Sequence, residues 1–381
     1  MGNSGSSQKV ETAPPSAAPP SSAAREELTK GSASGTQTSS GGSADPVLAL
    51  ANQTTDLDGI IRGIWSFIFS YTDGPPPVYH PKPILSMLRD AEELFKAEST
   101  VLDLQAPQCI VGDLHGQGDT LITLLSLADT PPKRNYLFLG NYAGQGFAPH
   151  ETLFLLLALK VKYPFKVHLL KGNLEEPEAI VAHDFIGGLS RRHLMENVFV
   201  WMALERVFQA MPLAAVIGNK HFCVHGGIGP RLLKVGLPRL RKVERPPVTP
   251  LDFALTLECQ WACLRLSSPN DKIVSMVPEM LNDGSPLFSE ADVAQFCFQN
   301  GLQTIIRSRQ VVNDGVLNLP AQLLTVWSAV SFLDNFRNMA AVLMIDSQPD
   351  KASIIRYKQL DMEPESLDDK KPMAGRNAIN I

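Results

Sequence analysis

The stretch Gly112-Asp113-Leu114-His115-Gly116, which closes the apolar run Cys109-Ile110-Val111, decides the fold of this chain. The apolar run predicts a buried strand, and the two glycines allow the backbone to turn sharply before a following helix. Asp113 and His115 stand two residues apart at this strand end, where both side chains can reach one metal ion. The motif therefore indicates a metal-dependent site at the end of a strand.

A strand followed by a polar turn occurs four more times further along the chain. The blocks are 136–146 (YLFLGNYAGQG), 169–176 (LLKGNLEE), 222–230 (FCVHGGIGP) and 306–315 (IRSRQVVNDG). Any one such block is a weak signal, whereas five in a fixed order are a strong one. Several positions in these blocks nevertheless hold side chains that cannot do the chemistry expected of such a site.

In order and spacing, the five blocks resemble the signatures GDxHG, GDxVDRG, GNHE, HGG and RAHQ of the phosphoprotein phosphatase family of Ser/Thr phosphatases, most closely its type-1 branch. The resemblance covers roughly residues 56 to 360. It implies an α/β chain with the calcineurin-like metallophosphoesterase fold, in which a central two-sheet β-sandwich is flanked by helices.

The resemblance also implies a site for two metal ions, and here the chain keeps only part of the pattern. Asp113, His115, Asn173 and His225 match the family's ligands. Asn141 stands where the family has the bridging Asp, and Arg309 stands at the position of the last ligand, a His. An arginine has no lone pair to give a metal. We therefore expect a degenerate site that binds no metal or one divalent ion such as Mn, Fe or Zn.

The positions that would act on the phosphate are changed as well. The family's general acid is replaced by Leu174, the Asp that orients that acid by Gly144, and a phosphate-clamping Arg by Gln145. A leucine cannot donate a proton, and general acid–base catalysis contributes about 10²–10⁴-fold to a rate. A second clamping Arg is replaced by Gly284 or Ser285, and Phe332 takes the place of a Tyr.

Each retained or exchanged residue also has a purely structural interpretation. Asp113 and His115 could brace the following helix, and Asn173 and His225 could be hydrogen-bonded core residues. Arg309 could place its guanidinium where a metal would be, paired with Asp113, as a built-in substitute for the metal. It could instead hold an anion, together with Lys171, that is never hydrolysed.

The chain of 381 residues divides into three parts by composition. Residues 1–55 are dominated by small and polar residues and are expected to be disordered, residues 56–361 form the phosphatase-like domain, and residues 362–381 are expected to be a flexible tail. The start Met1-Gly2-Asn3-Ser4-Gly5-Ser6 fits the pattern for myristoylation of Gly2. One myristoyl chain binds membranes only reversibly, so we expect a cytoplasmic protein peripherally attached to membrane.

Composition and periodicity narrow the remaining choices. The net charge of −5 argues against nucleic acid as a partner, and the five scattered cysteines indicate reduced core thiols. The cluster Arg239, Arg241, Lys242 and Arg245 is either a solvated face or a docking surface for an acidic partner. Helices are predicted over 57–70, 82–99, 120–127, 150–162, 176–182 and 195–208, and strands over 109–112, 136–140, 166–171, 213–217, 222–225, 338–345 and 353–359.

Three hypotheses of function follow. The first is a catalytically inactive phosphatase homologue, tethered to membrane, which acts by binding regulatory or scaffold proteins of the phosphatase type. The second is an active Ser/Thr phosphatase with an altered, single-metal site. The third is a protein that binds a phosphorylated ligand without hydrolysing it.

Overall fold

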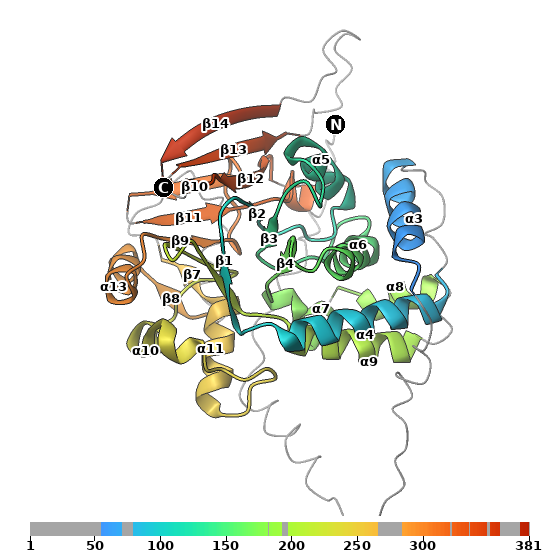
Figure 1. Cartoon of the computed structure of the whole chain (residues 1–381), viewed down its shortest axis with the longest axis horizontal. Coiled ribbons are helices and arrows are strands. Elements are labelled where there is room, and N and C mark those ends of the chain that lie inside the picture. Colours follow the sequence, from blue (N-terminus) through green and yellow to red (C-terminus); the bar gives the residue numbers. More distant parts are fainter. Residues whose placement is uncertain are drawn as a thin grey trace, which may run out of the picture.

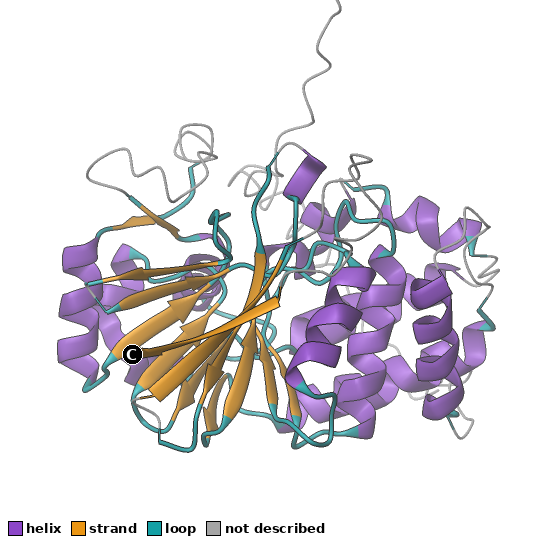
Figure 2. Ribbon diagram, turned by 90° about the horizontal axis from the view of Figure 1, so that it is seen from above, coloured by secondary structure: helices purple, strands orange, loops and turns teal. Residues whose placement is uncertain are grey.

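The central feature of the computed structural model is a pair of six-stranded sheets packed face to face, with helices on both outer sides (Figures 1 and 2). The structure describes residues 55–70, 79–181, 183–192, 197–265, 284–320, 322–334, 336–348, 351–358 and 374–380. Figure 2 shows the strands as a central layer, with the larger group of helices on one side and a smaller group on the other. The α/β class and the two-sheet sandwich predicted from the sequence are confirmed.

The first sheet has the strand order β1-β5-β6-β9-β11-β10. Its strands β5 and β6 form the predicted hairpin, and Gly218 and Asn219 at its turn both have positive φ angles of 59° and 58°. Such angles suit a tight two-residue turn. The strands of this sheet are β1 (Val101–Leu104), β5 (Ala214–Ile217), β6 (His221–Val224), β9 (Thr304–Arg307), β10 (Val316–Leu319) and β11 (Leu323–Val326).

The second sheet has the order β14-β13-β12-β2-β3-β4, and a two-stranded sheet pairs β7 (Cys263–Leu264) with β8 (Leu287–Phe288). In the second sheet, β2, β3 and β4 are parallel, while β12, β13 and β14 are antiparallel to their neighbours. The strands are β2 (Gln108–Val111), β3 (Tyr136–Phe138), β4 (Val167–Leu169), β12 (Ala340–Ile345), β13 (Lys351–Tyr357) and β14 (Ala374–Asn380).

Helices cover the outer face of each sheet. Those on the second sheet form the larger layer: α3 (Leu57–Ser70), α4 (Pro81–Ala97), α5 (Gly118–Ala128), α6 (Pro149–Lys162), α7 (Pro177–Val181), α8 (Phe185–Arg191) and α9 (Asn197–Ala210). Those on the first sheet are α10 (Pro230–Leu240), α11 (Pro250–Trp261) and α13 (Glu290–Asn300). Two short 3₁₀ turns are η1 (Asn173–Glu175) and η2 (Phe332–Asp334). In the described part of the chain, no helix is both long enough and apolar enough to span a bilayer.

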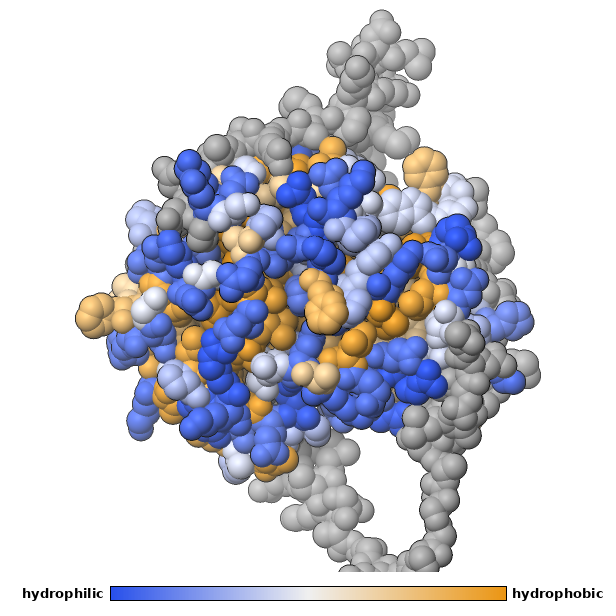
Figure 3. Space-filling view, viewed as in Figure 1, coloured by the Kyte–Doolittle hydropathy of each residue, from blue (hydrophilic) through white to orange (hydrophobic). Residues whose placement is uncertain are grey.

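The strands are apolar on both faces because each sheet is covered on both sides. Along β12, Leu343 points into the core between the sheets, whereas Val342 and Met344 point into the core under the helices. A strand buried on both faces gives a continuous apolar run instead of an alternating one. The five cysteines are buried and free, as expected from the sequence. Figure 3 shows that one outer face carries mainly hydrophilic residues, with smaller apolar areas between them.

The structure describes part of the C-terminal segment but almost none of the N-terminal one. The predicted disordered segment, residues 1–55, and its Gly2 lie outside the described residues except for Thr55. Within the segment 362–381, which is predicted to be a flexible tail, residues 374–380 form β14 and pair along the whole of β13. No pattern in the segment AGRNAIN predicts this pairing, because the segment is poor in residues that favour strands.

Candidate active site

The turn after β2 is fixed by hydrogen bonds from the neighbouring sheet. The backbone N–H of Gly112 donates to the Ser328 hydroxyl, and that of Asp113 donates to the Ser308 hydroxyl, both at 2.8 Å. A side chain at Gly112 would meet the Val326 carbonyl oxygen at 2.1 Å, so only glycine fits against β11 there. The two sheets are thereby joined at the strand end that carries Asp113.

The Asp113 carboxylate is completely buried and has a partner on each oxygen. Its Oδ1 accepts from the backbone N–H of Arg309 at 3.0 Å, and its Oδ2 accepts from Asn141 Nδ2 at 2.8 Å and lies 3.0 Å from His115 Nε2. Burial alone would raise the pKa of Asp113, but the nearby His225 and His115 and the hydrogen bonds of the group outweigh it and hold the pKa well below its usual value. The carboxylate is therefore ionised at neutral pH.

Asn141 turns its amide nitrogen, not its oxygen, towards Asp113. Its Oδ1 accepts from the backbone N–H of Leu174 at 2.9 Å, and this donor fixes which end of the amide points where. The Nδ2 atom then donates to Asp113 and, at 3.0 Å, to Asn173 Oδ1. The family's bridging carboxylate is thus replaced by a group that gives hydrogen bonds to its neighbours.

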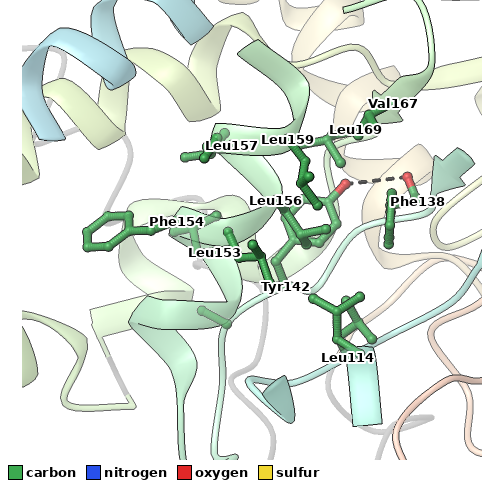
Figure 4. Close-up of a cluster of buried hydrophobic side chains, with 14 of the residues drawn as sticks. Leu114, Phe138, Tyr142, Leu153, Phe154, Leu156, Leu157, Leu159, Val167 and Leu169 are labelled. Carbon is green, nitrogen blue, oxygen red and sulfur yellow. Dashed lines mark hydrogen bonds between the residues drawn. The ribbon is translucent and has the colours of Figure 1, made fainter. Parts of the chain in front are cut away.

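The backbone around Asn141 is held by a buried core on one side and by a carboxylate on the other. Tyr142 extends into the cluster formed by Leu114, Phe138 and α6, as Figure 4 shows, and its hydroxyl donates to the carbonyls of Leu170 at 2.5 Å and Phe138 at 3.3 Å. Glu175 accepts from the backbone N–H groups of Asn141, Tyr142 and Gly172 at 2.8–3.0 Å. Burial raises the pKa of Glu175 to about 7, although these three donors favour its ionised form.

Asn173 and His225 face each other within the same network. His225 Nδ1 lies 3.0 Å from the Leu139 carbonyl and therefore donates to it, while its Nε2 lies 2.9 Å from Asn173 Oδ1. Burial lowers the pKa of His225 to about 4, with Arg309 adding to the effect and Asp113 opposing it. A neutral His225 that donates from Nδ1 turns the lone pair of Nε2 towards the Asn173 oxygen. Neither atom of this Nε2–Oδ1 contact then carries a hydrogen.

Arg309 brings a permanent positive charge into the site. Its side chain is only 4% exposed, and its Nη1 lies 3.4 Å from Asn173 Oδ1. The guanidinium carbon lies 4.7 Å from the centre of the Trp261 ring, a distance suited to a cation–π contact. Among the described residues, its Nε and Nη2 atoms have no hydrogen-bond partner.

The exchanged residues around this network differ in burial, packing and backbone conformation. Leu174 is 2% exposed and packs in a small apolar cluster with Ala179 and Trp261. Gly144 has φ +153°, and a side chain there would lie 3.0 Å from His115 Nδ1. An Asp at this position would therefore be strained, which agrees with the loss of the family's residue. Gln145 is exposed, and the Phe332 ring lies beside the His115 ring, with 4.5 Å between centroids and an angle of 46° between the ring planes.

The structure brings together six of the predicted site residues and adds others that the sequence analysis missed. The six are Asp113, His115, Asn141, Asn173, His225 and Arg309. The missed residues hold the backbone or contact Arg309: Glu175, Trp261, Ser308 and Ser328. Lys171, considered as an anion ligand with Arg309, instead pairs with Glu176 at 2.8 Å. Glu175 could have been found, because it occupies the Glu position of the block that resembles GNHE.

Residues 107–308 match the family model of calcineurin-like phosphoesterases. The chain belongs to this family. Within this family, the chain is 30% identical over 316 residues to the serine/threonine-protein phosphatase BSL2 of Arabidopsis thaliana. That alignment covers 80% of this chain and only 31% of the relative, so the chain spans about a third of that protein's length.

A solved structure supports the fold independently. The protein serine/threonine phosphatase from Saccharomyces cerevisiae with similarity to human phosphatase PP5 superposes with a TM-score of 0.63 at 22% identity, covering 77% of this chain and 93% of the other. At this identity the likeness concerns the fold alone. Metallophosphoesterases usually bind divalent metals. In the described ranges, no cluster of three or more His, Cys, Asp or Glu side chains is arranged to hold a metal ion.

Proposed function

We propose that this chain is a non-hydrolysing member of the Ser/Thr phosphatase branch that acts by binding other proteins. The observation that carries the proposal is the buried guanidinium of Arg309, which reaches Asn173 Oδ1 at 3.4 Å. Asn173 matches a metal ligand of the family, so a side chain with a fixed charge competes directly with a metal for that oxygen.

The residues present do not suit a pair of divalent cations. Two metals need anionic ligands between them to offset their repulsion, and the only carboxylate in the network of six is Asp113. Asn141 would have to break its bond with the Leu174 N–H before its oxygen could turn inwards. Because Arg309 adds a further positive charge, we derive no hydrolytic step through metals.

The residues that would act on a bound phosphate ester support the same proposal. Leu174 packs against Trp261 at the position of the general acid, and it has no proton to give to a leaving alkoxide. Gln145 replaces a charged phosphate contact, and even the loss of one neutral hydrogen-bond donor to an oxyanion costs about 2.7–4 kcal/mol of transition-state stabilisation in acyl-transfer enzymes. Such losses are not additive, yet either alone slows the reaction greatly.

The test is turnover of a small aryl phosphate by the purified chain with added Mn²⁺, alongside an Asp113→Ala control. We expect equal, background rates from both, in protein that unfolds cooperatively. Turnover that disappears in the Asp113→Ala variant would overturn the proposal, because it would require a working metal site that includes Asp113.

The binding role is proposed to involve regulatory or scaffold proteins of the phosphatase type, close to a membrane. The two-sheet framework of the family is present, so proteins that bind the outer surface of such phosphatases could bind this chain as well, whether or not it is catalytic. We further propose that Gly2 carries a myristoyl group and attaches the chain reversibly to membrane from the cytoplasm. Coexpression with a myristoyltransferase should add one myristoyl mass, and a Gly2→Ala variant should lack it; an unmodified Gly2 chain would contradict this part of the proposal.

A single-metal phosphatase is a second candidate, and one contact favours it. His225 Nε2 and Asn173 Oδ1 lie 2.9 Å apart, and two lone pairs at this distance need a proton or a cation between them. The low pKa of His225, about 4, makes the extra proton unfavourable. One tightly held metal per chain, lost in a His225→Ala variant, would support this candidate.

A non-hydrolysing phosphate binder is a third candidate, favoured by the two Arg309 nitrogens that lack partners among the described residues. Both could donate to one anion. Inorganic phosphate should then raise the melting temperature of the chain and leave that of an Arg309→Met variant unchanged. No stabilisation at high phosphate would remove this candidate.

A further inference from the structure

The loop between α6 and β4 presents an exposed aromatic side chain among basic ones. Phe165 is 88% exposed, and the surrounding sequence is KYPFK over residues 162–166. Lys166 is exposed too, whereas Lys162 pairs with Asp58 of α3. An aromatic side chain held in water gains free energy when it enters an apolar layer, and lysines beside it are attracted to anionic headgroups.

A second basic loop, which precedes β3, lies beside the first. The backbone N–H of Tyr136, the first residue of β3, donates to the Lys166 carbonyl at 2.7 Å and so joins the two loops. The second loop carries the exposed Lys133 and also Arg134, which pairs with Asp129. The ion pairs at the two loops are neutral overall, so the positive charges of Lys133 and Lys166 are left over.

The same end of the domain receives the N-terminal segment. Asp58, in the first turn of α3, contacts Lys162 at the end of α6, and Figure 1 shows α3 beside α6. Residues 1–54 therefore join the described part of the chain next to the two basic loops. A lipid on Gly2 would be tethered at this end of the domain.

The candidate active site lies at the opposite end of the second sheet. Asp113, Asn141 and Asn173 follow the ends of β2, β3 and β4, whereas the two basic loops precede β3 and β4. These three strands are parallel, so their starts share one edge of the sheet and their ends share the other. A membrane that contacts the two loops would leave the site open to the solution.

We infer that Lys133, Phe165 and Lys166, the basic–aromatic surface, dock the domain on an anionic membrane. Phe165 enters the headgroup layer, and the two lysines lie among anionic lipid headgroups. The surface holds the domain in one orientation, with the candidate active site turned away from the lipid.

This inference rests on the proposed attachment of the chain to membrane and supplies what that attachment lacks. One myristoyl chain alone gives only marginal binding, and a stable anchor needs a second signal. Residues 1–54 do not provide a basic cluster, since their three basic residues are scattered: Lys9, Arg25 and Lys30. The basic–aromatic surface on the folded domain provides both charge and an apolar side chain.

The test is sedimentation of the N-myristoylated full chain with two kinds of vesicle, phosphatidylcholine alone and phosphatidylcholine with about 30% phosphatidylserine. Because each lysine near an anionic surface contributes about fivefold in affinity, Lys133→Gln/Lys166→Gln should weaken binding to the anionic vesicles by about 5- to 25-fold. The same change should leave binding to the neutral vesicles as it was. Phe165→Ala should weaken binding to both kinds by about 3- to 10-fold.

Matched controls lie on other parts of the domain. Phe69 is 79% exposed at the far end of α3, so Phe69→Ala removes an equally large apolar side chain away from the surface. Lys234 and Lys242 are exposed in α10 and just after it, on the side of the first sheet. Neither Phe69→Ala nor Lys234→Gln/Lys242→Gln should change the affinity for either kind of vesicle by more than about twofold.

A labelling experiment shows directly which end meets the lipid. The five natural cysteines are buried, so a polarity-sensitive dye reacts selectively with Phe165→Cys or Phe69→Cys. We expect the emission of the dye at position 165 to shift to shorter wavelength on anionic vesicles and that at position 69 to stay unchanged. Equal shifts at both positions would overturn the inference.

The outcomes separate this surface from the lipid anchor. Gly2→Ala should weaken binding to both kinds of vesicle and keep the ratio between them, which is measured at a higher lipid concentration. If the surface variants bound vesicles as their controls do, the inference would be overturned while the anchor stood. Unchanged vesicle binding by Lys133→Gln/Lys166→Gln, together with loss of a dimer detected by light scattering, would assign the surface to a second copy of the chain and overturn the inference as well.

Discussion

The segments that follow β2 and β9 meet in the candidate active site, and they differ in how many residues of the family pattern they keep. The turn after β2 keeps both residues of the family pattern, Asp113 and His115, whereas the segment after β9 has Arg309 in place of a His. Yet the two segments are joined backbone to side chain: Asp113 N–H donates to Ser308, and Arg309 N–H donates to Asp113. Hydrogen bonds thus hold the backbone of both segments, while Arg309 brings a positive charge to the position of a His.

The residues of the site fall into two groups, those that hold the backbone and those exchanged relative to the family pattern. The anchor residues, Glu175, Ser308 and Ser328, accept hydrogen bonds from backbone N–H groups. The exchanged residues, Asn141, Leu174 and Arg309, have partners among themselves and their immediate neighbours. We therefore expect the anchor residues to matter more for stability than the exchanged ones.

The largest effect is expected from an anchor residue. Glu175→Ala leaves three buried backbone N–H groups without an acceptor, and each unsatisfied donor costs about 1–3 kcal/mol, or roughly 3–9 kcal/mol together. Urea unfolding of the variant measures the loss. Glu175→Gln keeps one acceptor oxygen and should lose clearly less. A loss below about 1 kcal/mol for Glu175→Ala would mean that the three bonds do not fix this backbone.

A smaller loss is expected from an exchanged residue. Arg309→Met keeps much of the side-chain volume but removes the charge, the contact with Trp261 and the hydrogen bond to Asn173. We expect a loss of about 1–2 kcal/mol in the free energy of unfolding. Arg62→Met, at an exposed position of α3, is the matched control and should change little. A loss from Arg309→Met as large as that from Glu175→Ala would break the contrast between the two groups.

The buried His150, which lies in the framework and outside the site, should make the stability of the chain depend on pH. Burial, reinforced by the charge of Arg192, lowers the pKa of His150 to about 3, and its ring donates from Nε2 to the Phe185 carbonyl. Because the folded pKa lies below the ordinary value of about 6.5, His150 reduces stability as the pH falls from about 6.5 towards 3, by up to about 1.4 kcal/mol per pH unit.

A His150→Gln variant should therefore have a flatter dependence of unfolding free energy on pH in this range, even if it is less stable at pH 7. His80→Gln, at an exposed position, should leave the slope unchanged. Equal slopes for the natural chain and His150→Gln would show that this histidine is not buried in its neutral form.

The smallest effect is expected on the surface. The basic cluster singled out in the sequence is largely paired within the chain: Arg239 with Asp252 at 2.6 Å, and Arg241 with Asp103 at 2.7 Å. The Asp103–Arg241 pair is well exposed, so Arg241→Ala should change the free energy of unfolding by about 0–1 kcal/mol. A larger loss would give this pair a structural role comparable to that of the exchanged residues.

The sequence predicted the fold and the membership of the site better than it predicted the contacts. Five ordered motifs gave the sandwich, and every helix expected before residue 182 lies within a few residues of an observed one, because strand and helix periodicity are strong in buried segments. The motifs placed Arg309 in the same site as Asp113, but not by the contact considered from the sequence, a pairing of its guanidinium with Asp113. In the structure the backbone N–H of Arg309 donates to Asp113, and its Nη1 lies near Asn173 Oδ1. These features follow from local patterns in the sequence.

Other features depend on distant packing and had no local signal. The orientation of the Asn141 amide is set by Leu174, thirty-three residues away, and the contact between Arg309 and Trp261 joins the last motif to the end of α11. The pairing of 374–380 with β13 opposes the residue preferences of that segment, because the edge of a sheet can pair with almost any extended backbone.

The most direct test of the central claim, that hydrogen bonds and Arg309 have replaced metals in this site, is the metal content of the purified chain after dialysis against Mn²⁺, compared with an Asn141→Asp/Arg309→His variant. The account predicts essentially no tightly bound Mn in the natural chain, an unchanged melting temperature with a chelator, and measurable Mn in the double variant. One or more tightly bound metals per natural chain, with a melting temperature that falls when they are removed, would contradict it.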